Sequence, residues 1–392
     1  MELAFPVDRS DLYRPLDRNV LLDPSPTYRR LLTESPSFWH GDLFAWVLTR
    51  HRDCRRVLQD PSSFTRDRRK LGRNVPADGM TIQSLDPPDQ VPLRRALVHT
   101  LVPSHVEGAI AAACVAFDSR LSARVTGQPF DFMAEVAAPV ATGFACRLVG
   151  MPGMEAHSYL GIFDRLTRAM DSALDARLYD EGLDATRELN ELVQQAMRDP
   201  AEDGVVGRLM ASPGVAQMPE DYVRNTISAT FNAAFSTAYS LLGSILLLVV
   251  QRGGLARRIV DAAAVRTGVQ ELLRLLCPAQ STRRYATRDV ALGDVVVRAH
   301  DPVFTLMAAA NRDPDVFESP DELLIGRERN PHLAFGFGPH HCAGARPITA
   351  FLEALIPRYA GWEARLVLAE PPEWLDTFTL RCLARLEVAR TS

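Results

Sequence analysis

The 392-residue sequence has almost no lysine and no apolar run long enough to cross a membrane. Lys70 is the single lysine among 44 lysine and arginine residues, so nearly all of the positive charge is guanidinium. The longest apolar runs, 109–117 and 245–250, fall far short of the ~20 residues that a spanning helix needs. The first residues lack the basic and apolar regions of a signal peptide. We therefore expect a cytoplasmic protein without a membrane anchor.

Paired cysteines and flexible linkers are absent as well. The six cysteines, at positions 54, 114, 146, 277, 342 and 382, form no C-x-x-C pair, which argues against a zinc site and against a disulfide framework. The net charge of −4 argues against a nucleic-acid partner. No low-complexity tract or repeat divides the chain, and 47% of its residues are hydrophobic. We expect one domain over residues 1–392.

What the sequence does contain is a glycine-rich loop around one cysteine. The loop reads Phe335-Gly336-Phe337-Gly338-Pro339-His340-His341-Cys342-Ala343-Gly344, and an apolar helical pattern follows over 349–359. Glycine lets a backbone run close against a bulky, flat ligand. A cysteine just before a helix is favoured as thiolate by the helix dipole. Such a thiolate can ligate a metal or act as a nucleophile; a buried thiol in a turn is the alternative interpretation.

The spacing F-G-x-G-x-H-x-C-x-G resembles the heme-binding loop of the cytochrome P-450 superfamily, the heme-thiolate monooxygenases. The resemblance implies heme b (iron protoporphyrin IX), with Cys342 as the axial thiolate and iron ligand, which favours O–O cleavage. It also implies that His340 contacts a heme propionate and that Phe335, Gly336 and Gly344 belong to the cofactor-binding loop. The implied fold is mostly α with small β-sheets: a triangular prism with heme between a long helix and the Cys loop.

Two further runs carry arginines that the resemblance assigns to the heme propionates. Residues 85–95 resemble the family's D-P-P-x-H-x-x-x-R pattern, which puts Arg94 at a propionate-binding position and Gln90 in place of the usual histidine. Glutamine still donates a hydrogen bond but carries no charge. Arg284, within 283–290, matches the second propionate arginine. A solvated helix arginine is the alternative interpretation of Arg94.

The longest helical pattern begins at Pro219, continues without proline to Val250 and stops at Gly253-Gly254. At 1.5 Å per residue, about 30 residues give roughly 45 Å, enough to cross a domain. The resemblance places the substrate pocket at the centre of this helix. Relatives carry there a small-residue pair, a variable residue, an acid and a threonine, and this chain has Ala233, Ala234, Phe235, Ser236 and Thr237.

The departure from the family at Ser236 affects proton delivery. We expect Ser236 and Thr237 to be the catalytic hydroxyls, but a serine does not ionise at neutral pH, so the acidic half of the relay is missing. We expect the five central residues to line the pocket, and Phe235, if it faces the pocket, favours an apolar or flat substrate. An ordinary core helix with incidental polar residues is the alternative interpretation.

A second motif concerns structure rather than chemistry. Glu271 and Arg274 share a helix face at i and i+3 and match the family's E-x-x-R motif, which braces the heme loop in relatives. Alone the motif is weak, because a surface ion pair has the same spacing. The resemblance adds an arginine shortly before the Cys loop, for which Arg327 is the best candidate and Arg329 the fallback.

Other segments predict local structure. Residues 37–49 alternate around Gly41-Asp42 and predict a β-hairpin. The segment 66–80 has no periodicity and corresponds to a loop that covers the substrate in relatives. Asp301-Pro302 predicts a helix that continues through 308–310, and 374–388 predicts a final hairpin whose tip brings Phe378 into the pocket.

These features predict a heme-thiolate oxidoreductase of the monooxygenase type, an oxidative tailoring enzyme for an apolar small molecule or biosynthetic intermediate. Electrons would come from a ferredoxin-type donor with its reductase, docking near Cys342. Two alternatives stay open. One is a heme-thiolate enzyme that performs a rearrangement, cyclisation or coupling without standard oxygen insertion, and the other is a non-catalytic heme-binding or docking module.

Overall fold

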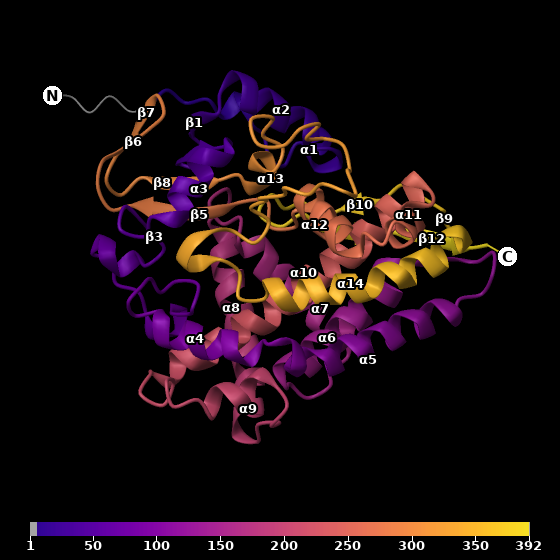
Figure 1. Cartoon of the computed structure of the whole chain (residues 1–392). Helices are drawn as coiled ribbons and strands as arrows, with labels where there is room; N and C mark the ends of the chain where they lie inside the picture. Colours follow the sequence, from indigo (N-terminus) through magenta and orange to yellow (C-terminus); the bar gives the residue numbers. More distant parts are fainter. Residues whose placement is uncertain (1–5, 392) are drawn as a thin grey trace.

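The longest element, α10 (Glu220–Arg252), crosses the molecule and forms the centre of its helical part (Figure 1). Its 33 residues correspond to about 50 Å at 1.5 Å per residue. Two acidic residues occupy its first turn, where they interact favourably with the helix dipole. The helix ends at Gly253, whose φ of 49° is accessible to glycine without strain. The prediction of a long helix over 219–250 is confirmed.

The computed structural model describes residues 6–391. Within that range α10 is the single helix that is long and apolar enough to cross a membrane, and 72% of its most apolar window is buried inside the protein. The helices α4 (Val91–Thr100) and α5 (Pro103–Ser122) pass the same test only when joined across a bend of 54°. A buried core helix meets the same criteria as a membrane span.

The other helices form layers around α10, with α6, α8 and α14 among its direct neighbours. The α-helices of the described chain, besides α10, are α1 (Arg18–Leu22), α2 (Ser25–Glu34), α3 (His51–Gln59), α4 (Val91–Thr100), α5 (Pro103–Ser122), α6 (Ala138–Val149), α7 (Ala156–Ala169), α8 (Arg177–Arg198), α9 (Val205–Met210), α11 (Leu255–Asp261), α12 (Val265–Leu276), α13 (Met307–Ala310) and α14 (Ala345–Trp362). Short 3₁₀ or π turns are η1 (Ser10–Leu12), η2 (Arg68–Leu71), η3 (Ala77–Gly79), η4 (Met133–Ala137), η5 (Gly338–His340) and η6 (Glu363–Arg365).

Four small sheets complete the described chain, as the predicted fold class requires. The largest has the order β1-β2-β8-β5-β3, with β1 (Ser37–His40), β2 (Ala45–Leu48), β8 (Pro302–Thr305), β5 (Thr282–Ala286) and β3 (Phe64–Thr65). The others are β4 (Pro129–Asp131), β12 (Glu387–Arg390) and β9 (Leu366–Leu368); β6 (Val290–Leu292) with β7 (Val295–Val297); and β10 (Glu373–Trp374) with β11 (Leu383–Arg385). The hairpin predicted over 37–49 is β1–β2.

The prediction of a helix directly after Pro302 is wrong. Residues 302–305 form β8, the central strand of the largest sheet, which pairs parallel with β2 and antiparallel with β5. The helical part is limited to α13 (Met307–Ala310). Val303 and Phe304 are buried, and pairing of β8 on both sides outweighs the local helix preference. Proline is tolerated because it is the first residue of the strand.

The Cys loop lies where two hydrophobic cores meet. Phe335 packs against the large cluster of the helical part, and Phe337 packs against the cluster under the largest sheet. Ala334 contacts both clusters. The loop is therefore held from two sides by folded structure, which fixes its position relative to α10.

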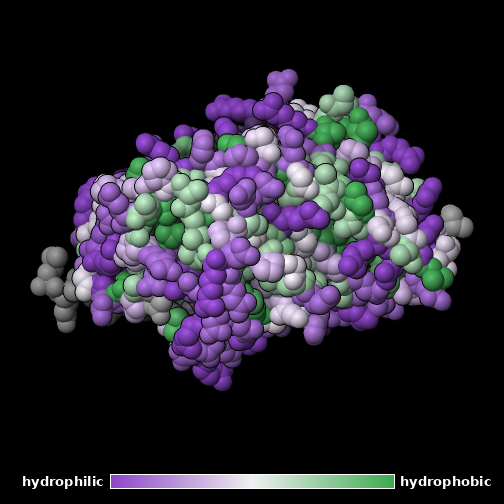
Figure 2. Space-filling view, turned by 90° about the horizontal axis from the view of Figure 1, so that it is seen from below, coloured by the Kyte–Doolittle hydropathy of each residue, from purple (hydrophilic) through white to green (hydrophobic). Residues whose placement is uncertain are grey.

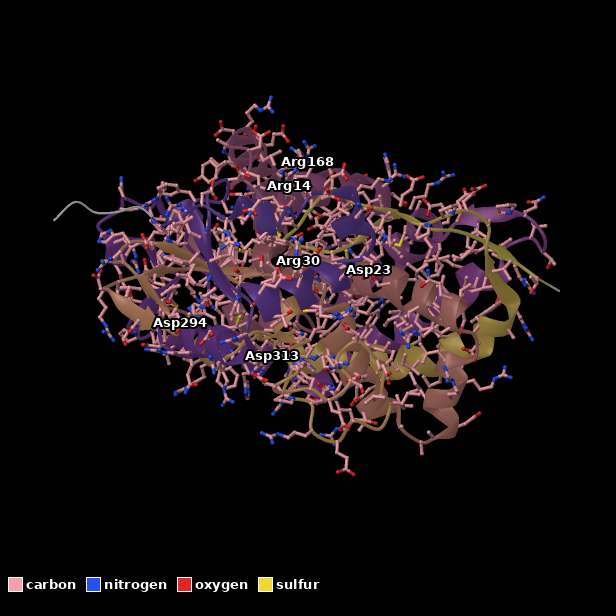
Figure 3. All side chains as sticks on the ribbon, turned by 90° about the horizontal axis from the view of Figure 1, so that it is seen from above. Arg14, Asp23, Arg30, Arg168, Asp294 and Asp313 are labelled. Carbon is pink, nitrogen blue, oxygen red and sulfur yellow. The ribbon has the colours of Figure 1, made fainter. Side chains whose placement is uncertain are left out.

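The outline in Figure 1 is roughly triangular, with both described ends of the chain at its periphery. Seen from below, hydrophilic residues cover most of the surface and apolar patches are small and scattered (Figure 2). Seen from above, charged side chains point outward around the rim (Figure 3). The helical outline and small sheets match the architecture expected from the sequence.

Candidate heme-thiolate site

The backbone of the Cys loop folds back on itself and requires glycine at two positions. Gly336 and Gly338 have φ of 66° and 71°, values that favour glycine. A Cβ on Gly338 would also lie 2.5 Å from the Leu58 carbonyl oxygen of α3. The Cys342 N–H donates to the Phe335 carbonyl at 2.8 Å, which closes the loop. The loop then leads into α14, which begins three residues after Cys342.

Cys342 differs from the other five cysteines of the chain, because it alone is exposed in the described structure. Its thiol therefore borders open space although the loop is anchored in the interior. Although part of Cys342 is accessible, the many protein atoms around it desolvate the thiol and raise its pKa, while a hydrogen bond from the Gly344 backbone and the Arg94 charge act in the opposite direction. The expectation that the helix dipole favours the thiolate is therefore not enough to lower the pKa of Cys342. A metal cation bound at Sγ would stabilise the thiolate.

The centre of α10 is open on one face. Ala233 is exposed, and Ala234 and Thr237 are half-buried, although the helix is otherwise part of the core. Exposed alanine in the middle of a core helix means that an internal space borders it. The Thr237 hydroxyl has no hydrogen-bond partner among residues 6–391. Ser236 is buried and its Oγ donates to the Ala233 carbonyl at 3.4 Å, so it bonds to its own helix.

Phe235 does not lie on the open face of α10. Its side chain is fully buried, with ring centroids 4.7 Å from Tyr159 and 5.2 Å from Phe163 on α7, and it stacks on Tyr239 at 5.3 Å. Two residues along a helix turn by about 200°, so Phe235 and Ala233 point in opposite directions. The expectation that Phe235 faces the pocket is corrected: its ring packs α10 against α7.

Phe378 is also placed away from the open face. Its side chain is 4% exposed, and its ring lies 5.8 Å from Phe304 in the core under the largest sheet. The Asp171 carboxylate accepts the backbone N–H groups of Phe378 and Thr379 at 2.8 and 3.1 Å. The tip of the final hairpin is therefore tied to the α7–α8 connection, and the predicted insertion of Phe378 into the pocket is corrected.

A cluster of buried positive charge lies beside the loop. Arg284, on β5, is 3% exposed and donates from Nη1 to Thr282 Oγ1 and to the Arg283 carbonyl, at 3.1 and 2.9 Å. Burial, reinforced by the Arg66 charge, lowers the pKa of Arg284 well below its usual value, although Asp86 opposes this. Burial likewise lowers the pKa of Arg66 to about 10. The guanidinium of Arg66 has no hydrogen-bond or ion-pair partner within the described residues.

This cluster tests whether the chain fits a heme. Two guanidiniums share one neighbouring carboxylate, Asp86, and buried charge without a partner is costly. Two heme propionates would supply the missing negative charge through charge-assisted hydrogen bonds. Cys342 and Ala233 are each exposed, although the elements that carry them pack against the core. The residues present are therefore compatible with a bound heme. Arg66 was missed from the sequence because it lies in the aperiodic segment 66–80.

His340 has protein partners at both ring nitrogens. Its Nε2 lies 2.7 Å from Asp86 Oδ1, and the Gln90 side-chain amide lies 3.0 Å from its Nδ1. Burial, with the charges of Arg66 and Arg284, lowers the pKa of His340 to about 4 despite Asp86. A neutral ring then donates from Nε2 to Asp86 and accepts from Gln90 at Nδ1. This arrangement leaves Arg284 and Arg66 better placed than His340 to donate to a propionate.

Arg94 connects α4 to the Cys loop. Its Nη2 donates to the His341 carbonyl at 2.5 Å, and the side chain is half-buried. Burial lowers the pKa of Arg94, and the charge of a Cys342 thiolate would raise it. A guanidinium held beside the cysteine favours the thiolate form.

Glu271, Arg274 and Arg327 form one buried network. Arg327 Nε lies 3.1 Å from Glu271 Oε2, and Asn330 donates to the same oxygen at 3.0 Å. Arg274 also donates to the carbonyls of Asn311 and Pro320 at 2.8 and 2.6 Å. The network holds the irregular segment 311–330 that precedes the Cys loop. Arg327 was expected from the sequence, whereas Asn330 was missed because an asparagine before proline indicates only a turn.

Comparison with known proteins agrees with this geometry. The family model described as Cytochrome P-450 matches residues 264–347. Nocardicin C N-oxygenase of Nocardia uniformis subsp. tsuyamanensis is 30% identical over 394 residues, which cover 95% of this chain and 97% of that protein. The chain belongs to the cytochrome P-450 family. Mycinamicin IV hydroxylase/epoxidase of Micromonospora griseorubida is 29% identical, with 86% of this chain and 87% of that protein covered.

Solved structures of cytochrome P-450 proteins share the fold. The structure of CYP109E1 from Bacillus megaterium in complex with testosterone has a TM-score of 0.85 at 18% identity and covers 96% of this chain and 100% of that chain. The crystal structure of CalO2 has a TM-score of 0.82 at 24% identity and covers 97% and 98%. The protein is accordingly a P-450 enzyme of the monooxygenase type, and its family uses heme b with a cysteine thiolate ligand.

Proposed function

We propose that this P-450 enzyme is an oxidative tailoring enzyme that acts on an apolar small molecule, with Cys342 as the axial iron ligand. The observation that carries the proposal is the exposed thiol of Cys342 in an anchored loop, beside a buried excess of guanidinium. Relatives named as a nocardicin C N-oxygenase and a mycinamicin IV hydroxylase/epoxidase support a role in the modification of biosynthetic intermediates. The alanine-lined face of α10 supports an apolar substrate.

Different residues of the chain would bind heme, leave room for the substrate and transfer protons. When bound, heme supplies the oxygen chemistry. Cys342 would hold the iron through Sγ, and Arg284, Arg66 and Arg94 would neutralise the propionates. The small side chains of Ala233 and Ala234 would leave room for the substrate. These roles orient the reactants and exclude water, whereas the cofactor determines the class of reaction.

Proton handling at α10 is reduced compared with relatives that carry an acid. The Thr237 hydroxyl has no protein partner among the described residues, so it is free to hold one water or one proton at Oγ1. Ser236 cannot ionise and its hydroxyl bonds to the Ala233 carbonyl. We infer that protons come from the substrate or from ordered water. The same observation favours a second candidate function: a rearrangement, cyclisation or coupling that needs fewer protons than standard oxygen insertion.

The ligand assignment is tested by replacing Cys342. The Cys342→His and Cys342→Ala proteins should lose the thiolate-type Soret band of the ferrous–CO complex, while heme content is measured separately. A variant that keeps this band would show that another residue ligates the iron. Product identification with candidate intermediates distinguishes oxygen insertion from the second candidate function.

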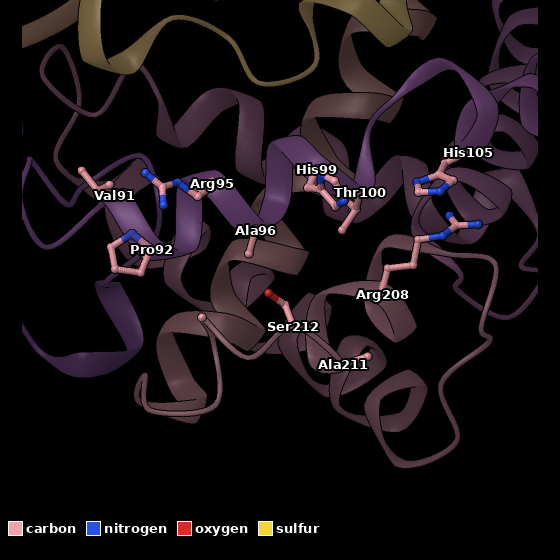
Figure 4. Close-up of a pocket in the computed structure, with 11 residues that line it drawn as sticks. Val91, Pro92, Arg95, Ala96, His99, Thr100, His105, Arg208, Ala211 and Ser212 are labelled. Carbon is pink, nitrogen blue, oxygen red and sulfur yellow. The ribbon is translucent and has the colours of Figure 1, made fainter.

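A ferredoxin-type electron donor is the proposed redox partner, and the charge of the α4 surface supports its docking there. A groove of about 750 Å³ lies along the outer side of α4 and is bordered by Arg95, His99, His105 and Arg208 (Figure 4). Within the described structure, no acidic side chain lines it. Arg95 adjoins Arg94, which contacts the Cys loop. An acidic protein should therefore bind near Cys342, and Arg95→Glu should weaken electron transfer more strongly at low salt.

A further inference from the structure

One buried carboxylate, Asp86, joins three parts of the chain that are separate in sequence. Its side chain has no exposed surface. Oδ1 accepts from His340 Nε2 at 2.7 Å, within the Cys loop. Oδ2 accepts from the Thr65 hydroxyl of β3 and lies 3.3 Å from Lys70 Nζ, in the short turn η2. Oδ1 also accepts from the backbone N–H of Arg66 at 3.4 Å. One carboxylate thus contacts both the Cys loop, through Oδ1, and the segment 66–80, through both oxygens.

The two side chains that pair with Asp86, His340 and Lys70, differ in how much of their surface is exposed. The His340 side chain is 4% exposed, whereas the Lys70 side chain is 40% exposed. His340 is therefore the fixed partner and Lys70 the partner that can leave. Hydrogen bonds from His340 and Thr65, with the Lys70 charge, lower the pKa of Asp86 strongly, although burial alone would raise it. The carboxylate is ionised at neutral pH and depends on these donors.

We propose that Asp86 is a positioning residue that links the position of Lys70 in the segment 66–80 to the placement of His340 in the Cys342 loop. A buried carboxylate that loses one donor is destabilised, so each partner holds Asp86 in the orientation that the other needs. Coupling of this kind is reciprocal. Disorder in the Cys loop should weaken the ion pair between Lys70 and Asp86. Removal of Lys70 should likewise weaken the hydrogen bond that holds His340 in the Cys loop.

The other end of the segment is attached to α10. Asn225 donates to the carbonyls of Ala77 and Met80 at 3.1 and 3.0 Å. The segment 66–80 is thus joined to α10 near one end and, through Lys70 and Asp86, to the Cys loop at the other. The link through Asp86 does not depend on the proposed function.

The sequence makes the link measurable, because Lys70 is the only lysine. Acetylation of the purified holoenzyme with an amine-reactive ester, followed by mass spectrometry of the Lys70 peptide, reports the freedom of this one side chain. Asp86→Asn should accelerate acetylation about threefold or more, the scale of a partly exposed ion pair. Asp89→Asn is the matched control, because Asp89 pairs with Arg69 of the same turn and not with Lys70.

The coupling itself is tested with variants that do not touch Lys70. His340→Phe should accelerate Lys70 acetylation about twofold or more, and Gln90→Leu, which removes the donor to His340 Nδ1, should give a smaller increase in the same direction. Gln90→Leu also provides an answer if His340→Phe does not fold. An unchanged or slower acetylation in both variants overturns the link.

The effect of Lys70 on the Cys loop is measured through the heme spectrum. Lys70→Met should lose the thiolate-type ferrous–CO band on warming about threefold faster than wild type, and Lys70→Arg, which keeps the charge, should restore the wild-type rate. Equal rates for Lys70→Met and wild type contradict the proposal. If the protein carried no heme, the proposed function would fail while the acetylation result still decided the Asp86 link.

Discussion

Arg274 donates two parallel hydrogen bonds to Glu271, from Nε to Oε2 at 2.9 Å and from Nη2 to Oε1 at 2.8 Å, and neither side chain is exposed. A buried pair of this kind contributes little by comparison with apolar residues, but breaking it leaves an uncompensated charge. Because the same carboxylate also accepts from Arg327 and Asn330, the pair determines where the segment before the Cys loop lies.

Arg274→Ala should therefore lower the free energy of unfolding by about 3 to 5 kcal/mol. The control is Arg298→Ala, which removes an ion pair whose two side chains are each 54% exposed and should cost less than about 1 kcal/mol. Urea unfolding of the holoproteins measures both values. Similar losses in the two variants would mean that the buried network has no special role.

Arg284→Ala and Arg66→Ala should release heme faster. Each removes a guanidinium that can donate to a propionate, and loss of one charge-assisted hydrogen bond corresponds to roughly tenfold or more in heme dissociation rate. Transfer of heme to excess apomyoglobin measures this rate. Arg283→Ala is the control, because Arg283 lies on the opposite face of β5 and stacks on Tyr285 and Phe304. Equal release by Arg283→Ala and Arg284→Ala would refute the propionate assignment.

The proton supply at α10 is tested by product formed per NADPH consumed. If the site is adapted to protons from substrate or water, Thr237→Ala should lower this ratio several-fold and Ser236→Asp should not improve it. Ser240→Ala, which removes a hydroxyl bonded to the Ser236 carbonyl one turn away, should leave it unchanged. If Thr237→Ala instead matches wild type while Ser236→Asp improves coupling, the enzyme is a poorly coupled hydroxylase.

Acid should destabilise the fold through His332. Burial, with the Arg274 charge, lowers the pKa of His332 to about 4, and its Nε2 lies 3.0 Å from Gln270 Oε1. The unfolded ring has a pKa near 6.5, so between about pH 6.5 and 4 the unfolded state binds more protons. Stability is fully present above the unfolded pKa and falls as the pH drops through this window.

His332→Gln should flatten the pH dependence of unfolding between about pH 6.5 and 4 by roughly 2 to 3 kcal/mol over the window. Unfolding midpoints in urea at several pH values measure the slope. His157→Gln serves as the control, because His157 is exposed on α7. An unchanged slope in His332→Gln would show that this ring does not titrate differently in the two states.

The anchoring of the final hairpin should depend on Asp171. Its buried carboxylate holds two backbone N–H groups of the hairpin, and an asparagine can accept at only one of its two side-chain atoms. Asp171→Asn should therefore lower the free energy of unfolding in urea by about 1 to 3 kcal/mol, the cost of a buried donor left without an acceptor. Asp164→Asn, on the exposed side of α7 and paired only with Arg168 in the described chain, should unfold within about 1 kcal/mol of wild type.

The features that depend on neighbouring residues could be predicted before the structure was known. The positive φ values of Gly336 and Gly338 follow from glycine positions around Cys342, and the length of α10 follows from an uninterrupted apolar pattern. The E-x-x-R spacing places Glu271 and Arg274 on one helix face. The hairpin over 37–49 followed from alternation and a turn. Each of these depends on neighbours within a few residues, so a short window of sequence contains the information.

Contacts between side chains that are distant in the sequence could not be predicted in the same way. Phe235 is two residues from Ala233, yet its ring lies on the opposite face of α10, where it packs against α7. Residues 302–305 became a strand because β2 and β5 pair with them on both sides. Three segments that are separate in the sequence bring Arg66, Asp86 and His340 together. No local sequence pattern predicts that these side chains are close in space. Burial of a side chain and pairing of its charge depend on the packing of the whole molecule. For this reason they could be determined only from the structure.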